Sequence, residues 1–233
     1  PGRWVVQAPL MQYADAPRRP VSLLWLAGLH VAALVVGHVL GSKSAELGPF
    51  LVTLTVLTFP ITFLTTDLVN ELEGRDWARR VTAIGLAAVV LAYVMIELAR
   101  RLPVAIGSHL PADAFDHVLA VPFAHVAALL SGYGFGQLVD IDMFHRVREL
   151  TKGGRLWMRV IISTAAGELA DGFVVTAFVL IAPAATAGPT PIPAALEITW
   201  DQAMLRLVMA VALLPVIYII HRANRAPFRP PSS

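Results

Sequence analysis

Two carboxylic acids, Glu168 and Asp171, lie one helical turn apart inside a long apolar stretch of the chain. Thr164 precedes them at a spacing that places all three on one face of a helix. Two acids this close in a medium of low dielectric do not both stay ionised without a cation nearby. The pattern therefore has two interpretations. It is either a ligand or proton site, or a structural acid pair tied to a basic group on a neighbouring helix, namely Arg206, His30 or His125.

A second polar group follows the aromatic pair Phe59 and Phe63, between which Pro60 is expected to weaken a helix. At helical spacing, Asp67 and Glu71 share one face, and Thr66, Asn70 and Glu71 roughly share another. One interpretation is a polar wall of a binding site beneath an aromatic shelf. The other is a helix end at the membrane boundary, whose acids pair with nearby arginines: Arg75, Arg79 and Arg80.

A third group lies in the apolar stretch before residue 140. Gln137 and Asp140 are three residues apart, and Tyr133 stands among the glycines Gly132, Gly134 and Gly136. Small residues allow close helix contact in membranes, so this segment is equally suited to packing and to ligand binding. His30 and His38 lie inside or near the end of the first apolar stretch. Each could relay protons or hydrogen-bond a neighbouring helix.

Several chemistries lack their sequence signatures. The chain has no HExxH motif, no close His/Asp cluster and no cysteine, so we predict no metal and no cofactor. A GxSxG nucleophile motif is also missing, and we expect no enzyme activity. The segment 37–44 faintly resembles a phosphate loop, but its spacing is wrong and it follows an apolar span instead of a strand.

The elements that must position these residues are membrane helices. Apolar residues make up 57% of the 233 residues and charged residues 15%, against about 45–50% and 25% in soluble domains. A helix needs about 20 apolar residues to cross a bilayer. The sequence predicts an all-α polytopic protein with six such helices, at 21–40, 49–66, 81–98, 118–139, 157–182 and 203–220. Five spans, with 157–182 re-entrant or peripheral, is the alternative.

The distribution of Lys and Arg favours an even number of spans. With both termini in the cytoplasm, 14 of these residues fall on the cytoplasmic side and 3 outside, as the positive-inside rule expects. We therefore predict cytoplasmic tails at 1–20 and 222–233 around a transmembrane domain at 21–221. The basic residues form no stripe, so we expect no nucleic-acid partner.

Three ordered motifs resemble the queuosine precursor transporter family, whose members resemble vitamin-uptake transporters. They are FPITFLTTDLVNELEGRDWARR at 59–80, GQLVDIDMFHRVRELTKGGRLWMR at 136–159 and ISTAAGELADGFVVTAFVL at 162–180. Arg206, Pro215 and Tyr218 also match the last span of that family. The resemblance covers about residues 21–220. The chain departs from it at Glu168, where family members usually carry an amide, and at His38, where Asn is common.

The resemblance implies an importer of 7-deazaguanine bases, such as 7-cyano- or 7-aminomethyl-7-deazaguanine, in the bacterial inner membrane, serving tRNA modification. It implies that polar residues of the second, fourth and fifth helices hold the base, that Glu168 or Asp171 reads the guanine edge, and that aromatic rings flank it. The predicted substrate-binding residues are Phe63, Asp67, Asn70, Phe123, Tyr133, Gln137, Asp140, Thr164, Glu168 and Asp171.

Three rival interpretations stay open. The chain could be a substrate-binding subunit for another vitamin or purine-like base that needs a partner ATPase. It could be a membrane enzyme that uses Glu168 and Asp171 as acid and base. It could also be a scaffold without a ligand. The expected partners are a small molecule and the lipid bilayer, and a homo-oligomer is left open.

Overall fold

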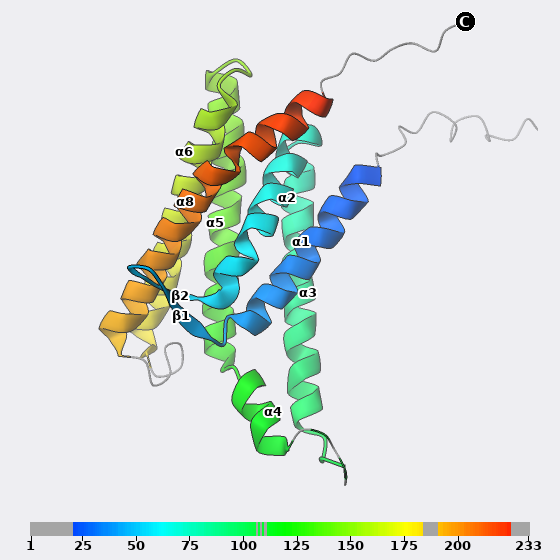
Figure 1. The fold of residues 1–233 in the computed structure, drawn as a ribbon, viewed down its shortest axis with the longest axis vertical. Helices are drawn as coiled ribbons and strands as arrows, with labels where there is room; N and C mark the ends of the chain where they lie inside the picture. Colours follow the sequence, from blue (N-terminus) through cyan, green and yellow to red (C-terminus); the bar gives the residue numbers. More distant parts are fainter. Residues whose placement is uncertain (1–20, 106, 108, 110, 184–190, 225–233) are drawn as a thin grey trace, which may run out of the picture.

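The fold is a bundle of long helices with one small hairpin. The computed structural model describes residues 21–105, 107, 109, 111–183 and 191–224. Its helices are α1 (Val21–Leu40), α2 (Phe59–Leu72), α3 (Arg75–Arg100), α4 (Ala112–Leu119), α5 (Phe123–Leu150), α6 (Leu156–Ile181) and α8 (Ile192–Asn224). Figure 1 shows that the long helices run up and down side by side, so successive ones point in opposite directions. Both Val21 and Asn224 therefore lie at the same end as the α5–α6 connection.

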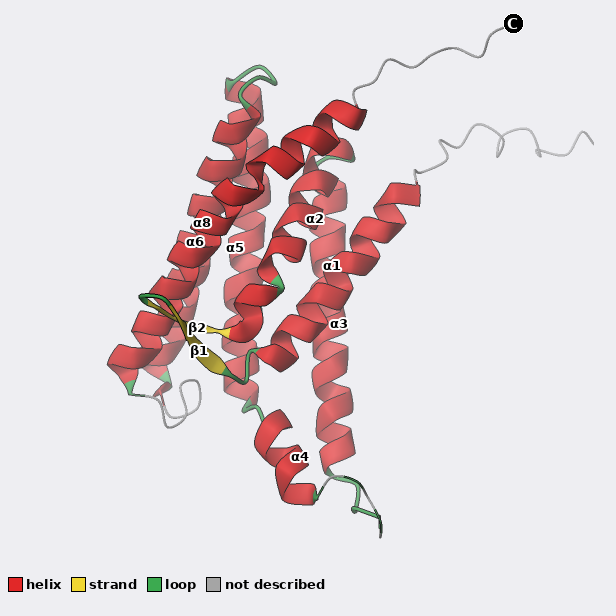
Figure 2. Cartoon of the chain, viewed as in Figure 1, coloured by secondary structure: helices red, strands yellow, loops and turns green. Residues whose placement is uncertain are grey.

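The strands β1 (Ser44–Leu47) and β2 (Phe50–Thr53) form an antiparallel hairpin, followed by the 3₁₀ helix η2 (Leu54–Leu57). Figure 2 shows this hairpin beside the lower half of α8. Gly48 adopts φ +62° at the turn, a conformation that glycine takes at little cost. We call the side that carries the hairpin and α4 the hairpin end, and the opposite side the α5–α6 end.

The helix expected at 49–66 is wrong in its first half, because residues 50–57 form β2 and η2 and the helix begins only at Phe59. Pro60 lies in the first turn of α2, where the missing backbone N–H costs no hydrogen bond. Pro60 therefore starts this helix and does not weaken it. The all-α expectation holds except for the hairpin.

The other expected helices are present with shifted bounds. The first and fifth agree with α1 and α6 to within one residue, and the third lies inside α3. The helix expected at 118–139 begins at Phe123, after Pro122, and continues to Leu150. The last begins at Ile192 and ends at Asn224, so it enters the expected C-terminal tail. The N-terminal tail at 1–20 lies outside the described residues.

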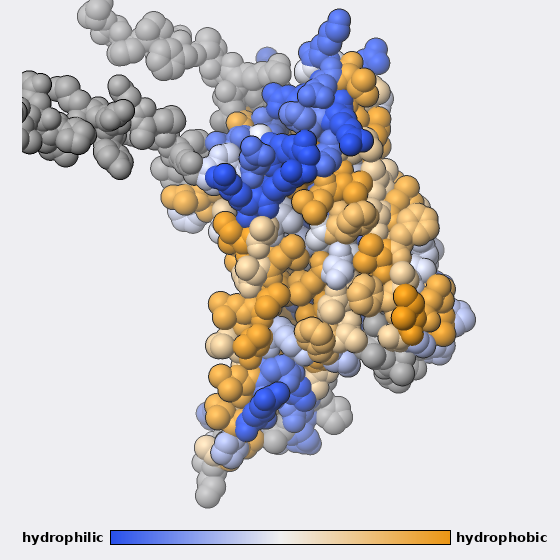
Figure 3. Space-filling model, turned by 180° about the vertical axis from the view of Figure 1, so that it is seen from behind, coloured by the Kyte–Doolittle hydropathy of each residue, from blue (hydrophilic) through white to orange (hydrophobic). Residues whose placement is uncertain are grey.

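The outer surface of the bundle is suited to lipid. Figure 3 shows a broad apolar surface between two hydrophilic ends. Large apolar side chains are exposed along the long helices, among them Trp25, Leu91, Phe173 and Ile219. Within the described residues, four helices are long and apolar enough to cross a membrane: Leu23–Leu40, Arg75–Arg100, Leu156–Ile181 and Ile192–Ile220.

The helix α2 is enclosed by other elements. Ten of its 14 residues are buried, from Phe59 to Glu71, and it contacts α1, α3 and α8. Its threonines bond back to carbonyls of the preceding turn, for example Thr66 Oγ1 to the Thr62 oxygen at 2.8 Å. These bonds satisfy hydroxyls that would be costly to bury unpaired. A short polar helix can therefore occupy the interior, away from lipid.

Candidate substrate-binding site

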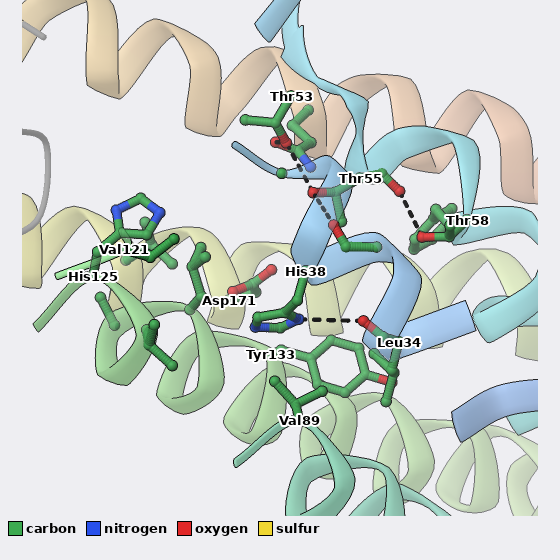
Figure 4. A pocket seen from close by; sticks show the side chains of 18 of the residues that line it. Leu34, His38, Thr53, Thr55, Thr58, Val89, Val121, His125, Tyr133 and Asp171 are labelled. Carbon is green, nitrogen blue, oxygen red and sulfur yellow. Dashed lines mark hydrogen bonds between the residues drawn. The ribbon is translucent and has the colours of Figure 1, made fainter. Parts of the chain in front are cut away.

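A cavity of about 600 Å³ lies inside the bundle, with walls from α1, α2, α3, α5, α6, α8 and the hairpin. Figure 4 shows part of its wall, where His38, Tyr133 and Asp171 come from three different helices. Its lining reaches residues at the surface of the hairpin end, including Ser42, Ser44 and Ala120. The volume falls within the roughly 300–1,000 Å³ of small-molecule sites.

An arginine bridges the two acids of α6. One Nη atom of Arg206, on α8, donates to Glu168 Oε2 at 3.2 Å and to Asp171 Oδ2 at 2.9 Å. The guanidinium also lies over the ring of Phe59, with its carbon 5.3 Å from the ring centroid. The acid pair is thus tied to a basic group of a neighbouring helix, as one interpretation of the sequence required. All four side chains nevertheless line the cavity, so the ion pair is part of its wall.

Glycines bring α5 and α6 together at this level. A Cβ atom on Gly136 would lie 2.8 Å from the Gly167 oxygen, and one on Gly167 would lie 2.9 Å from Asp140 Cβ. The backbones can approach this closely only without side chains. The glycine segment of α5 is therefore a packing face, and the same close contact holds Gln137 and Asp140 on the cavity wall beside Thr164.

Several polar atoms of the cavity wall have no hydrogen-bond partner. They are acceptors on Gln137 (Oε1) and Asp140 (Oδ1), the hydroxyl of Thr164, His38 Nε2 and the donor Nε of Arg206. A buried polar group without a partner costs about 1–3 kcal/mol. These atoms belong to residues of the cavity wall but are themselves shielded from the cavity, so a ligand that pairs with them recovers that cost only after the side chains reorient.

A row of threonines from β2, η2 and the start of α2 lines the cavity near α1 and α8, and sequence reasoning did not select it. The side chains of Thr53, Thr55, Thr58 and Thr62 lie on the wall, and Thr53 Oγ1 donates to Gln202 Oε1 at 3.1 Å. Figure 4 shows three of these threonines together. The repeated Thr between residues 53 and 66 is the sequence signal that points to this row. Because the sequence predicts a continuous helix over 49–66, helical spacing gives the wrong set of threonines on one face.

Of the ten residues predicted to bind substrate, six line this cavity: Tyr133, Gln137, Asp140, Thr164, Glu168 and Asp171. The structure does not bring the other four to its wall. Phe63 belongs to a buried apolar cluster with Phe144, and the Asn70 amide lies 3.4 Å from the Ile141 oxygen. Phe123 is 72% exposed. Asp67 is buried behind the wall, and its Oδ2 has no hydrogen-bond partner.

His30, which lies halfway along α1, contacts neighbouring helices. Its Nδ1 lies 3.2 Å from Thr65 Oγ1 and its Nε2 lies 3.4 Å from the Tyr133 hydroxyl. These contacts link α1 to α2 and α5, so His30 has the hydrogen-bonding role expected as one of its two alternatives. Within the part of the chain that the structure describes, no three His, Asp or Glu side chains gather as a metal site would require.

Ion pairs and an apolar cluster lie between the cavity and the α5–α6 end. Arg159 Nη1 donates to Glu71 Oε2 at 2.7 Å, and both side chains are almost fully buried. Asp142 accepts from Arg75 and Arg79 at 3.0 and 2.7 Å. Glu71 therefore pairs with Arg159 of α6 and, at 3.9 Å, with Arg148 of α5, whereas the sequence pointed to Arg75, Arg79 and Arg80. Phe59 of the apolar cluster reaches the cavity wall, whereas the ion-paired side chains do not line it, so the cavity does not extend through this region to the α5–α6 end.

These features define a multi-pass helical membrane protein with an internal cavity of small-molecule size, largely apolar but with a cluster of charged and polar side chains on its wall. The class that combines such a bundle with such a cavity is a membrane transporter. The sequence profile of the family described as "Putative vitamin uptake transporter" matches residues 53–220. The chain belongs to this family.

Curated relatives carry more specific names. The chain is 28% identical over 162 residues to the "Queuosine precursor transporter" of Escherichia coli K12, covering 69% of this chain and 70% of the relative. It is 26% identical to the "Probable queuosine precursor transporter" of Haemophilus influenzae over 66% of this chain and 67% of the relative. The Bacillus subtilis protein of the same name is 26% identical over 76% and 74%. No solved structure matches the chain.

Proposed function

We propose that this protein imports a 7-deazaguanine precursor of queuosine, with a 7-cyano or 7-aminomethyl group, across the bacterial inner membrane for tRNA modification. The names of three relatives support the substrate class. The observation that carries the proposal is the cavity wall, where the carboxylates of Asp140, Glu168 and Asp171 and the guanidinium of Arg206 line a space of about 600 Å³. A guanine edge presents an N–H and an exocyclic NH₂, which pair with one carboxylate through two hydrogen bonds.

The recognition step follows from the arrangement of these groups. Of the ten residues predicted from the sequence, the proposed binding residues are the six on the cavity wall, which can touch a base in this conformation. A carboxylate of Glu168, Asp171 or Asp140 would accept from the guanine edge. The ring of Tyr133 would provide an aromatic face. Bases lacking the exocyclic NH₂ would leave a buried acceptor unpaired, which selects strongly against them.

For the topology, we propose six membrane spans with both ends in the cytoplasm. The six are the four most apolar helices, α1, α3, α6 and α8, together with α2 and α5. The alternating directions of the helices in Figure 1 support an even number. In the described residues, basic side chains gather on segments at the α5–α6 end: Arg75, Arg79, Arg80, Arg146, Arg148, Lys152, Arg155, Arg159 and Arg222. The hairpin end has Lys43, Arg100 and Arg101. The positive-inside rule then assigns the α5–α6 end to the cytoplasm.

With this orientation the cavity opens outward, as an importer awaiting substrate would. Release to the cytoplasm requires separation of the apolar cluster around Phe63 and Phe144 and of the Glu71–Arg159 pair. Alternating access around a fixed central site is the general mechanism of such transporters. A role of Glu168 and Asp171 as enzymatic acid and base fits less well, because Arg206 bridges both.

Uptake by cells that cannot synthesise the deazaguanine tests the proposal, with queuosine in tRNA as the readout. Asp171→Asn keeps the size of the side chain but removes a carboxylate from the wall, while Arg206 retains Glu168. We expect uptake to be abolished with normal amounts of folded protein. The matched control is Asp76→Asn, the same change at an exposed position of α3. Normal uptake by the Asp171 variant would refute the proposed site.

A further inference from the structure

The charges on the cavity wall do not balance. In the described residues, the lining contains three carboxylates, on Asp140, Glu168 and Asp171, and one guanidinium, on Arg206. Arg206 contacts Glu168 and Asp171, both through the same Nη atom. One cation therefore serves two acids, and Asp140 adds a further carboxylate whose Oδ1 has no hydrogen-bond partner.

The unpartnered atoms show the same bias toward acceptors. His38 Nδ1 lies 3.4 Å from the Leu34 oxygen. A carbonyl can only accept, so this contact makes Nδ1 the donor and leaves Nε2 as an acceptor on the neutral ring. Gln137 Oε1 and Asp140 Oδ1 are also acceptors without partners. Against them stand the Arg206 Nε donor and the Thr164 hydroxyl, which can donate or accept.

Burying ionised acids in excess over bases is costly. Either protonation of an acid or a bound group that supplies positive charge and donors offsets this cost. A primary ammonium has one unit of positive charge, three N–H donors and no acceptor. It therefore supplies both the positive charge and the hydrogen-bond donors that this wall lacks. A nitrile has neither charge nor donor. The two candidate substrates share the ring system and differ only in the group at the 7-position, which is a linear neutral acceptor in one and a cationic donor in the other.

We propose that the cavity selects a cationic base, and hence the 7-aminomethyl over the 7-cyano precursor, with Glu168 and Asp140 as the residues that determine this preference. The inference rests on the proposed function and specifies its substrate. Glu168 is the informative position, because its removal leaves Arg206 paired with Asp171 at 2.9 Å. The ion pair would survive while one negative charge of the wall is lost.

The test uses three ligands with the same ring system: 7-aminomethyl-, 7-cyano- and 7-carboxy-7-deazaguanine, which are cationic, neutral and anionic. Their dissociation constants are measured by isothermal titration calorimetry on the detergent-purified full chain. We expect the aminomethyl ligand to bind at least about tenfold more tightly than the cyano ligand, a difference of about 1.4 kcal/mol. The carboxy ligand should bind most weakly.

The variants then assign the preference to the wall. Glu168→Gln should reduce the ratio of cyano to aminomethyl dissociation constants by about tenfold or more, mainly by weakening the cationic ligand. Glu149→Gln, the same change at an exposed residue of α5, should leave the ratio unchanged. Asp140→Asn provides a second test should the Glu168 variant not fold, and we expect it to lower the same ratio.

The outcomes separate the two proposals. Equal or tighter binding of the cyano ligand overturns the charge-based preference and leaves the importer proposal standing. A Glu168 or Asp140 variant that weakens both ligands by the same factor also overturns it, because the residue would then read the common ring. Failure of all three deazaguanines to bind would overturn both.

Discussion

The buried ion pair between Glu71 and Arg159 provides the most direct test of how the closed end of the cavity is held. Arg159→Met removes the guanidinium and keeps a side chain of similar length. The Arg159 side chain is 1% exposed and that of Glu71 is 4% exposed. The guanidinium also lies over the Phe144 ring at 5.4 Å and donates to the Gly153 oxygen at 3.3 Å.

The expected loss of stability is large because the substitution removes the buried partner of a buried carboxylate, whose neighbour Arg148 is 3.9 Å away and 40% exposed. Removing one partner of a buried pair costs about 3–5 kcal/mol. For a chain of this length, about 2–4 °C of melting temperature corresponds to each kcal/mol. The Arg159→Met variant should therefore melt roughly 6–20 °C below the parent.

The difference in melting temperature is measured in detergent by heating each variant and monitoring the loss of its folded peak in size-exclusion chromatography. The control is Arg148→Met, since Arg148 is 3.9 Å from the same carboxylate but 40% exposed. An exposed pair is worth about 0–1 kcal/mol, so its variant should melt within about 4 °C of the parent. The double variant Glu71→Met with Arg159→Met should recover part of the loss, because no unpaired charge stays buried.

Two results would refute this reasoning. Arg159→Met could melt as high as the Arg148 control, in which case the buried pair contributes no more than an exposed one. The double variant could also melt lower than Arg159→Met alone, which would mean that packing and not charge pairing holds this region.

Three further predictions concern packing, surface charge and the extent of the site. Gly136→Ala would place a Cβ atom 2.8 Å from a backbone oxygen and should cost about 1–3 kcal/mol of stability, measured by melting, whereas Gly28→Ala meets no atom within 4 Å and should melt no lower than the parent. Asp142→Asn removes the negative charge that pairs with two arginines, so its melting temperature should fall at low salt, and this deficit should shrink in about 1 M NaCl, where screening acts within about 3 Å; an equal deficit at both salt concentrations would contradict an electrostatic origin. Phe123→Ala should leave deazaguanine affinity unchanged in calorimetry, because the ring is 72% exposed and lies off the cavity wall, and a clear loss of affinity would show that the site reaches the start of α5.

The sequence predicted the long helices well where a single property decides them. Apolar runs of about 20 residues have few alternatives to a helix in a bilayer, so the helices at 21–40 and 157–182 agree with α1 and α6. The stretch at 49–66 is equally apolar but becomes a hairpin, a 3₁₀ turn and a short helix. Hydropathy cannot distinguish a helix that spans the bilayer from an apolar segment of another structure that is buried inside the protein, because both consist of apolar residues.

The sequence alone determined which polar side chains of α6 lie on the same helix face. The spacing of Thr164, Glu168 and Asp171 follows from the helical repeat, and the structure places all three on one cavity wall. Only the tertiary structure decided which basic group faces them. Arg206, His30 and His125 were equal candidates by sequence, and the packing of α8 against α6 selected Arg206. Helix periodicity determines which side chains within one or two turns of the same helix share a face. Which helices pack together depends on how closely their backbones approach, for example at Gly136 and Gly167. The same packing decided which of the repeated threonines reach the cavity wall and that Asp67 does not line it, because the repeat is visible in the sequence but its orientation is not.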